Sequence, residues 1–183
     1  MEMKAVLTDK IKECIQSWDK SGIYAVSLFV YDNDDNPCEP TVTLGYNTEE
    51  SFRDALEYAS DGQEAKWNYA FWLQNEELVF GAGETQPLVR EWLEQSGFTY
   101  YSYDEMFEDE PDEASYEGIT DAFVRILVDT VKELHASGFV KEQFGREIPL
   151  IIHELEYYDQ IAEQNIEANG LELVRDFAKF CRE

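Results

Sequence analysis

The chain has 183 residues, of which 44% are apolar, and its 40 acidic side chains outnumber 14 basic ones to give a formal net charge of −26. This charge excludes nucleic acid and anionic membrane surfaces as expected ligands, because Lys and Arg side chains supply most of the binding to both. A basic protein is the expected partner of such a surface.

The length predicts a single domain over residues 1–183, because a domain typically contains about 100–200 residues. Eleven Phe, eleven Tyr and four Trp provide material for a core, and no apolar run approaches the roughly 18 residues of a membrane span. The charged first 18 residues do not have the pattern of a signal peptide. The cysteines, Cys14, Cys38 and Cys181, form no C-x-x-C pair. They predict unpaired thiols and a cytoplasmic location.

The first third of the chain predicts a helix, a hairpin and a second helix. Apolar residues recur at helical spacing over 7–18, and the apolar run 23–31 predicts a strand that is buried on both faces. Residues 41–46 predict its antiparallel neighbour across an acidic turn at 32–37. Asn47, with Glu50 three residues later, predicts the cap of the next helix, which Asp61 and Gly62 are expected to end.

The remaining chain predicts two weaker strands and several helices. Alternation of Trp67, Tyr69, Phe71 and Leu73 favours a strand, and a short strand is expected at 78–80. Helices are predicted near 87–97, over 119–136, and on both sides of Asn169, with a loop or acidic excursion at 98–116 and a strand at 149–153. The expected fold is α+β, with a small, mainly antiparallel sheet and five or six surrounding helices.

The acidic turn does not predict a metal site. In a calcium loop of the EF-hand type that begins at Asp32, a glycine would stand at position six and a glutamate at position twelve. Pro37 and Thr43 occupy these positions. A solvated hairpin tip is the expected role of the turn, and neither a metal nor a cofactor is predicted, since the chain also has no glycine-rich phosphate loop.

The pair His153 and Glu154 resembles the start of a zinc-protease motif, but Tyr157 stands where the second histidine is required. Histidine beside carboxylates can act as a general base. One hypothesis is therefore a small enzyme or ligand-binding domain with a pocket formed by Trp67, Trp72, His153 and Glu154. A buried, hydrogen-bonded structural histidine is the alternative interpretation.

A second hypothesis rests on an acidic segment at 104–117, which has eight carboxylates and no Lys or Arg. Carboxylates attract a basic protein over long range, and interleaved aromatic residues can anchor it. The expected partner-binding residues are Asp104, Glu105, Phe107, Glu108, Asp109, Glu110, Asp112 and Glu113. A solvated acidic loop without a partner, or a mimic of DNA that displaces nucleic acid from a basic protein, are the alternatives.

Two strings of the sequence carry a resemblance to a known family. They are the W-x4-W block from Trp67 to Trp72 and the P-L-I-I-H-E string that contains His153. Together they resemble a bacterial family of single-domain proteins, the domain-of-unknown-function family number 4303, over nearly the whole chain. The resemblance implies no catalytic residues. In size and acidity the chain is similar to small cytosolic immunity and antitoxin-like proteins, so we expect a protein-binding module that sequesters a basic partner.

Overall fold

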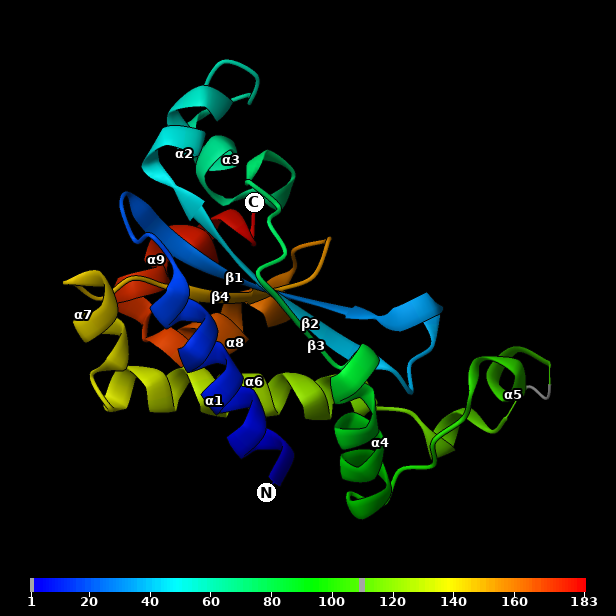
Figure 1. The fold of residues 1–183 in the computed structure, drawn as a ribbon. Helices are drawn as coiled ribbons and strands as arrows, with labels where there is room; N and C mark the ends of the chain where they lie inside the picture. Colours follow the sequence, from blue (N-terminus) through cyan, green and yellow to red (C-terminus); the bar gives the residue numbers. More distant parts are fainter. Residues whose placement is uncertain (1, 109–110) are drawn as a thin grey trace.

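A four-stranded mixed sheet forms the centre of the computed structural model, which describes residues 2–108 and 111–183 (Figure 1). Its strands are β1 (Ile23–Asp32), β2 (Pro40–Thr48), β3 (Leu78–Phe80) and β4 (Leu150–His153), in the order β3-β2-β1-β4. β2 is antiparallel to β1 and β3, whereas β4 is parallel to β1. The expectation of a mainly antiparallel sheet is corrected by this parallel pair. A long helical connection carries the chain to β4, so no hairpin turn fixes its direction.

Nine α-helices are present in the described residues. The predicted α+β class is confirmed, but the predicted number of five or six helices is too low. Helices α3, α5 and α7 have six residues each, which is too short for a helical period to appear in the sequence. The nine are α1 (Glu2–Ser17), α2 (Glu49–Ala55), α3 (Gly62–Trp67), α4 (Gln86–Gln95), α5 (Tyr103–Glu108), α6 (Ile119–Ala136), α7 (Phe139–Phe144), α8 (Asp159–Asn169) and α9 (Leu171–Phe180).

The predicted strand at 67–73 is wrong, because α3 ends at Trp67 and a 3-10 turn, Tyr69–Phe71, follows. Asp61 was expected to end a helix but instead begins α3, since its carboxylate accepts the N–H groups of Gln63 (2.7 Å) and Glu64 (2.9 Å). Thr48 rather than Asn47 caps α2, with its hydroxyl accepting the N–H of Ser51 at 3.2 Å. Capping side chains at neighbouring positions compete, and tertiary contacts select one of them.

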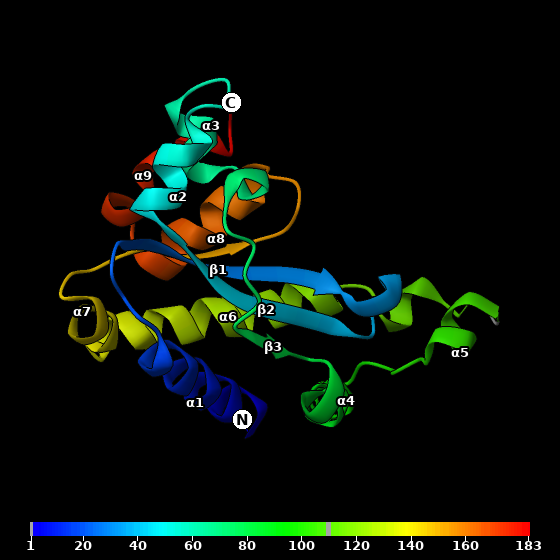
Figure 2. The same ribbon diagram turned by 45° about the horizontal axis from the view of Figure 1, so that its top comes forward.

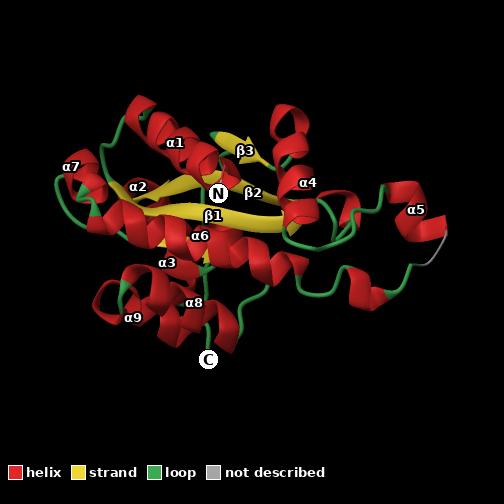
Figure 3. Cartoon of the chain, turned by 90° about the horizontal axis from the view of Figure 1, so that it is seen from below, coloured by secondary structure: helices red, strands yellow, loops and turns green. Residues whose placement is uncertain are grey.

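Helices cover both faces of the sheet. Figure 2 shows α1, α4 and α6 on one side of the strands, and α2, α3 and α9 on the other; Figure 3 shows α6 crossing the sheet lengthwise, between α1 and α8. Alternate residues of β1 therefore enter different clusters: Val26, Leu28 and Val30 pack in the larger core, and Ala25 packs in the second. Because β1 has β2 and β4 as its neighbours, the prediction of a central strand at 23–31 is confirmed.

Side-chain amides from α8 cover the free edge of β4. Asn165 accepts the N–H of Ile152 (2.9 Å) and donates to its carbonyl (2.7 Å). Asn169, one turn later, does the same for Leu150, at 2.8 and 3.0 Å. The two amides replace the hydrogen bonds that a fifth strand would make, so this edge is closed to further strand pairing.

All three cysteines are unpaired, as predicted. Burial raises the pKa of the Cys181 thiol to about 12, so this thiol has little reactive thiolate at neutral pH. Among the described helices, none combines the length and the apolar character that crossing a membrane requires.

Candidate functional site

Residues 98–108 and 111–118, here called the acidic arm, project from the body of the protein beside the end of the β1–β2 hairpin (Figure 1). The arm contains α5 and a 3-10 turn, Glu113–Ser115. Two of the predicted partner-binding residues, Asp109 and Glu110, lie outside the described residues. The other six are all exposed: Asp104, Glu105, Phe107, Glu108, Asp112 and Glu113.

A capping box begins α5. The Glu105 carboxylate accepts the N–H of Ser102 at 2.9 Å and its hydroxyl at 2.7 Å, while Ser102 Oγ accepts the N–H of Glu105 at 3.4 Å. These bonds lower the pKa of Glu105. The S-x-x-E spacing is a recognised signal for a helix start, and the prediction of a loop or acidic excursion at 98–116 did not include this helix.

Two aromatic rings are exposed on α5. Tyr103 and Phe107 lie one helical turn apart, with ring centroids 4.7 Å from each other, and they are 55% and 49% exposed. Met106, on another side of the helix, is 7% exposed. The buried methionine attaches α5 to the core, so the two rings are not needed for that attachment and remain available to a partner.

The base of the arm is tied to the hairpin connection that precedes β2. Asn36 Nδ2 donates to the carbonyl of Tyr101 at 3.0 Å, and the hydroxyl of Tyr100 donates to the Glu39 carboxylate at 2.7 Å. The guanidinium of Arg90 lies 4.3 Å from the centre of the Tyr100 ring. These contacts hold the arm next to the acidic hairpin tip, whose Asp34 and Asp35 are exposed.

The structure places His153 in the interior, with none of its surface exposed. Its Nδ1 lies 3.1 Å from the carbonyl of Glu154 and its Nε2 lies 2.8 Å from Ser27 Oγ. A carbonyl can only accept, so Nδ1 carries the ring proton and Nε2 accepts the hydroxyl proton of Ser27. This is the hydrogen-bond connectivity of a nucleophile and its base. However, Ser27 is 3% exposed, so no substrate reaches the pair in this conformation.

Aromatic rings surround His153. Its ring centroid lies 4.7 Å from that of Tyr69, 5.5 Å from Phe29, and 5.9 Å from both Trp72 and Tyr157. Burial lowers the pKa of His153 to about 4. A neutral, fully hydrogen-bonded histidine in this setting contributes packing and specificity to the core.

The four residues of the predicted pocket do not line one cavity. Trp72 contacts His153, whereas the Trp67 ring packs against Tyr24 and Phe177. Trp67 lines a hollow beside α9, whereas Glu154 lines a cavity at the ends of β1 and β4. Ser27, the hydrogen-bond partner of His153, could have been found from the sequence only with the register that pairs Phe29 with His153.

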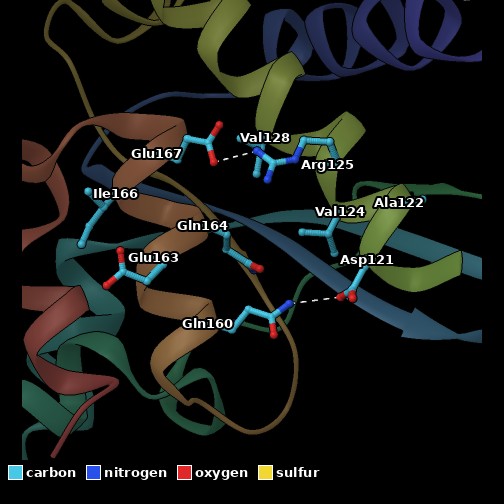
Figure 4. A pocket seen from close by; sticks show the side chains of 10 residues that line it. All are labelled: Asp121, Ala122, Val124, Arg125, Val128, Gln160, Glu163, Gln164, Ile166 and Glu167. Carbon is cyan, nitrogen blue, oxygen red and sulfur yellow. Dashed lines mark hydrogen bonds and ion pairs between the residues drawn. The ribbon is translucent and has the colours of Figure 1, made fainter. Parts of the chain in front are cut away.

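A groove of about 580 Å³ lies between α6 and α8 (Figure 4). Arg125 contacts Glu167 in this groove at 2.6 Å, and the neutral amide of Gln160 donates to Asp121 at 3.1 Å (Figure 4). Lys132 also pairs with Glu167, at 3.3 Å. Basic side chains therefore neutralise Glu167, whereas Asp121 has only a neutral hydrogen-bond partner.

No protein-family model, no curated protein and no solved structure matches the chain. The resemblance to family number 4303 therefore stays a prediction.

Proposed function

We propose that this protein is an acidic protein-binding module that sequesters a basic partner with its acidic arm. The observation that carries the proposal is the pair of exposed, mutually packed rings of Tyr103 and Phe107 on a projecting helix whose own charged residues are all acidic. Solubility alone does not require two half-exposed aromatic rings on a surface helix.

The two kinds of side chain have separate physical tasks. The carboxylates attract a cationic surface over a distance of about one Debye length, roughly 8 Å at physiological ionic strength, and so raise the association rate. The rings become buried at the interface and slow dissociation. Because Tyr100 and Tyr101 tie the base of the arm to the hairpin, the base needs little further ordering on binding, which favours affinity.

A protein that acts on nucleic acid is the partner class that fits best, because it must itself be cationic to bind phosphates. An acidic module that covers such a surface blocks access of the natural substrate. The chain would then act as an immunity or antitoxin-like protein. The chain is similar in size and acidity to immunity and antitoxin-like proteins, and this analogy supports the proposed role.

The test compares two matched variants in affinity capture from the native cell, followed by binding kinetics with the captured protein. The first variant neutralises the arm with Asp104→Asn, Glu108→Gln and Glu113→Gln. The control neutralises three exposed carboxylates outside it with Asp9→Asn, Glu13→Gln and Glu142→Gln. The arm variant should associate about tenfold more slowly and with a weaker salt dependence. If the control slows association as much as the arm variant does, net charge rather than the arm determines binding.

Phe107→Ala tests the aromatic contribution separately. We expect faster dissociation, by about tenfold or more, with little change in the association rate. Thermal unfolding should be nearly unchanged, because the ring is 49% exposed and substitutions at such surface positions usually change stability by about 0.5 kcal/mol or less. An unchanged dissociation rate would remove Phe107 from the interface.

A further inference from the structure

A second cavity, of about 410 Å³, lies where the carboxyl ends of the parallel strands β1 and β4 meet the first turn of α6. Parallel strands end at the same edge of a sheet, and ligand pockets commonly form there. Its walls combine carboxylates with apolar and aromatic groups: Phe29, Tyr31, Asp32, Glu154, Leu155 and Tyr158.

Three carboxylates line this cavity: Asp32 and Glu154, which are half-buried, and Glu156, which is exposed. The two half-buried carboxylates have no cationic partner. Asp32 accepts a hydrogen bond from the Thr120 hydroxyl at 3.2 Å, and Glu154 accepts one from the Tyr158 hydroxyl at 3.3 Å. Across residues 2–108 and 111–183, no Lys or Arg forms an ion pair with either of them. Burial raises the pKa of both groups, and the charge of Asp32 adds to the effect on Glu154. A cation bound here would offset this unfavourable desolvation.

This situation differs from that of the groove between α6 and α8, where Arg125 and Lys132 already neutralise Glu167. The groove contains a basic side chain of its own, whereas no Lys or Arg of the described residues lines the cavity at the strand ends.

The walls also determine what kind of cation fits. The rings of Phe29 and Tyr31 are stacked, with centroids 5.5 Å apart and planes at 24°. At the rim, Leu155 is 77% exposed and Tyr158 is 42% exposed. A guanidinium on a chain of methylene groups matches these features, because its planar fork binds carboxylates, its face stacks on aromatic rings and its stem covers apolar surface. A compact, strongly hydrated ammonium ion can pair with the carboxylates but does not offer the planar fork that binds them or stacks on the rings.

We infer that this cavity, here called the arginine socket, receives an arginine side chain of the basic partner. The inference rests on the proposed function, since it takes the occupant from a basic protein. The socket also lies near the arm: Asp32 directly precedes the hairpin tip to which the base of the arm is tied, and the hairpin end and the arm occupy the same end of the molecule (Figure 1). One partner can therefore contact both.

The socket is tested on the full chain with N-acetyl-arginine-N-methylamide as the probe, followed by changes in amide NMR signals. Signals of residues 29–32, 120 and 154–158 should shift together and saturate. The neutral citrulline analogue and the lysine analogue should bind at least about fivefold more weakly. Equal binding of citrulline would overturn the inference, and equal binding of lysine would overturn the choice of arginine. Shifts spread over the acidic surface without saturation would also overturn it.

Matched variants locate the binding. Asp32→Asn and Glu154→Gln should each weaken the arginine probe about fivefold or more. Asp34→Asn removes the same charge from an exposed position of the same hairpin and should leave the dissociation constant within about twofold. An equal loss in all three variants would show that only the general negative field attracts the probe. If Asp32→Asn does not fold, Glu154→Gln, which changes a residue beyond the other strand, decides the result.

Failure of the socket and failure of the arm give different results. If the probe fails to saturate the socket while neutralising the arm still slows the captured partner, the inference is wrong and the proposed function stands. If the probe binds as expected while the arm variant captures and binds the partner like the wild type, the socket stands and the proposed role of the arm is wrong.

Discussion

In the neutral ring of His153, Nδ1 donates to the Glu154 carbonyl and Nε2 accepts from Ser27. A second ring proton would require the Ser27 hydroxyl to turn its own proton elsewhere, and it would place a charge at a position without solvent exposure. His153, whose residue type suggested general-base chemistry, therefore has a structural role in the core. It has this role because it is buried, not because of its residue type.

His153 predicts a specific dependence of stability on pH. Its pKa is about 4 in the folded state and about 6.5 in an unfolded chain, so the unfolded state binds the proton more readily between these values. The contribution is fully present above pH 6.5 and is lost as the pH falls toward 4, by about 3 kcal/mol in total. The advantage of wild type over His153→Gln in urea unfolding should shrink by this order between pH 7 and pH 4.5. A constant difference between the two proteins would contradict it.

NMR of the imidazole gives an independent check. The His153 ring should keep its Nδ1–H tautomer and unchanged shifts from pH 8 to pH 5, and His135→Gln identifies which of the two histidine signals belongs to His153. A His153 signal that titrates near pH 6.5 would show that the ring is reached by solvent.

Gly45 on β2 is required for a close approach between chain segments. A Cβ at this position would lie 2.3 Å from the backbone oxygen of Asn75, whose side chain accepts the N–H of Tyr46 at 3.0 Å. We expect Gly45→Ala to reduce the free energy of unfolding by about 2 kcal/mol, because a backbone oxygen cannot move aside as a flexible side chain can. Gly62→Ala is the matched control, since the nearest atom to its added Cβ is 3.9 Å away. Equal effects of the two substitutions in urea unfolding would refute the role of the close approach.

At the scale of elements, the edge of β4 depends on side chains of α8. Asn165→Asp should destabilise the protein by about 2–3 kcal/mol in chemical unfolding, because a carboxylate would face the carbonyls of Ile152 and Ile161 that the amide now serves. Gln16→Glu makes the same chemical change at an exposed helix position, on α1, and should cost about 0.5 kcal/mol or less. If the two variants lose equal stability, the amides are not needed at this edge.

In the acidic arm, too, a few side-chain hydrogen bonds stabilise an element, in this case α5. Its helix has only six residues, yet the mutual bonds of Ser102 and Glu105 satisfy its first backbone donors. The spacing of these two residues could have been recognised in the sequence. The position of the arm against the hairpin could not, because Asn36 and Tyr101 are 65 positions apart.

At the scale of the whole molecule, the net charge of −26 makes repulsion between carboxylates a general cost of folding. The melting temperature should therefore rise as sodium chloride increases from about 10 mM, and should level off near 150 mM, where the Debye length is about 8 Å. Differential scanning calorimetry in chloride and in a second monovalent salt checks this. A melting temperature that falls over this range would mean that the surface ion pairs, such as Lys4 with Glu133, outweigh the repulsion.

The sequence by itself determined the features that depend on neighbouring residues. The apolar run at 23–31 predicted a central strand, the periodic stripe at 119–136 predicted a long helix, and the charge predicted an acidic surface. Each of these predictions depends only on local spacing or on composition. Neither requires knowledge of a tertiary contact. The alternation from Trp67 to Leu73 misled, because aromatic side chains at a short helix end and a 3-10 turn can show the same pattern as a strand.

Only the tertiary structure decided which distant residues meet. It brought Ser27 to His153 across the parallel pair β1 and β4 and removed both from solvent. It also placed Glu154 in the same cavity as Asp32, separate from Trp67 and Trp72. Strand direction and register are set by the packing of a long helical connection, so no local pattern encodes them. For that reason the acidic arm could be predicted from the sequence as a candidate surface, whereas the arginine socket could not.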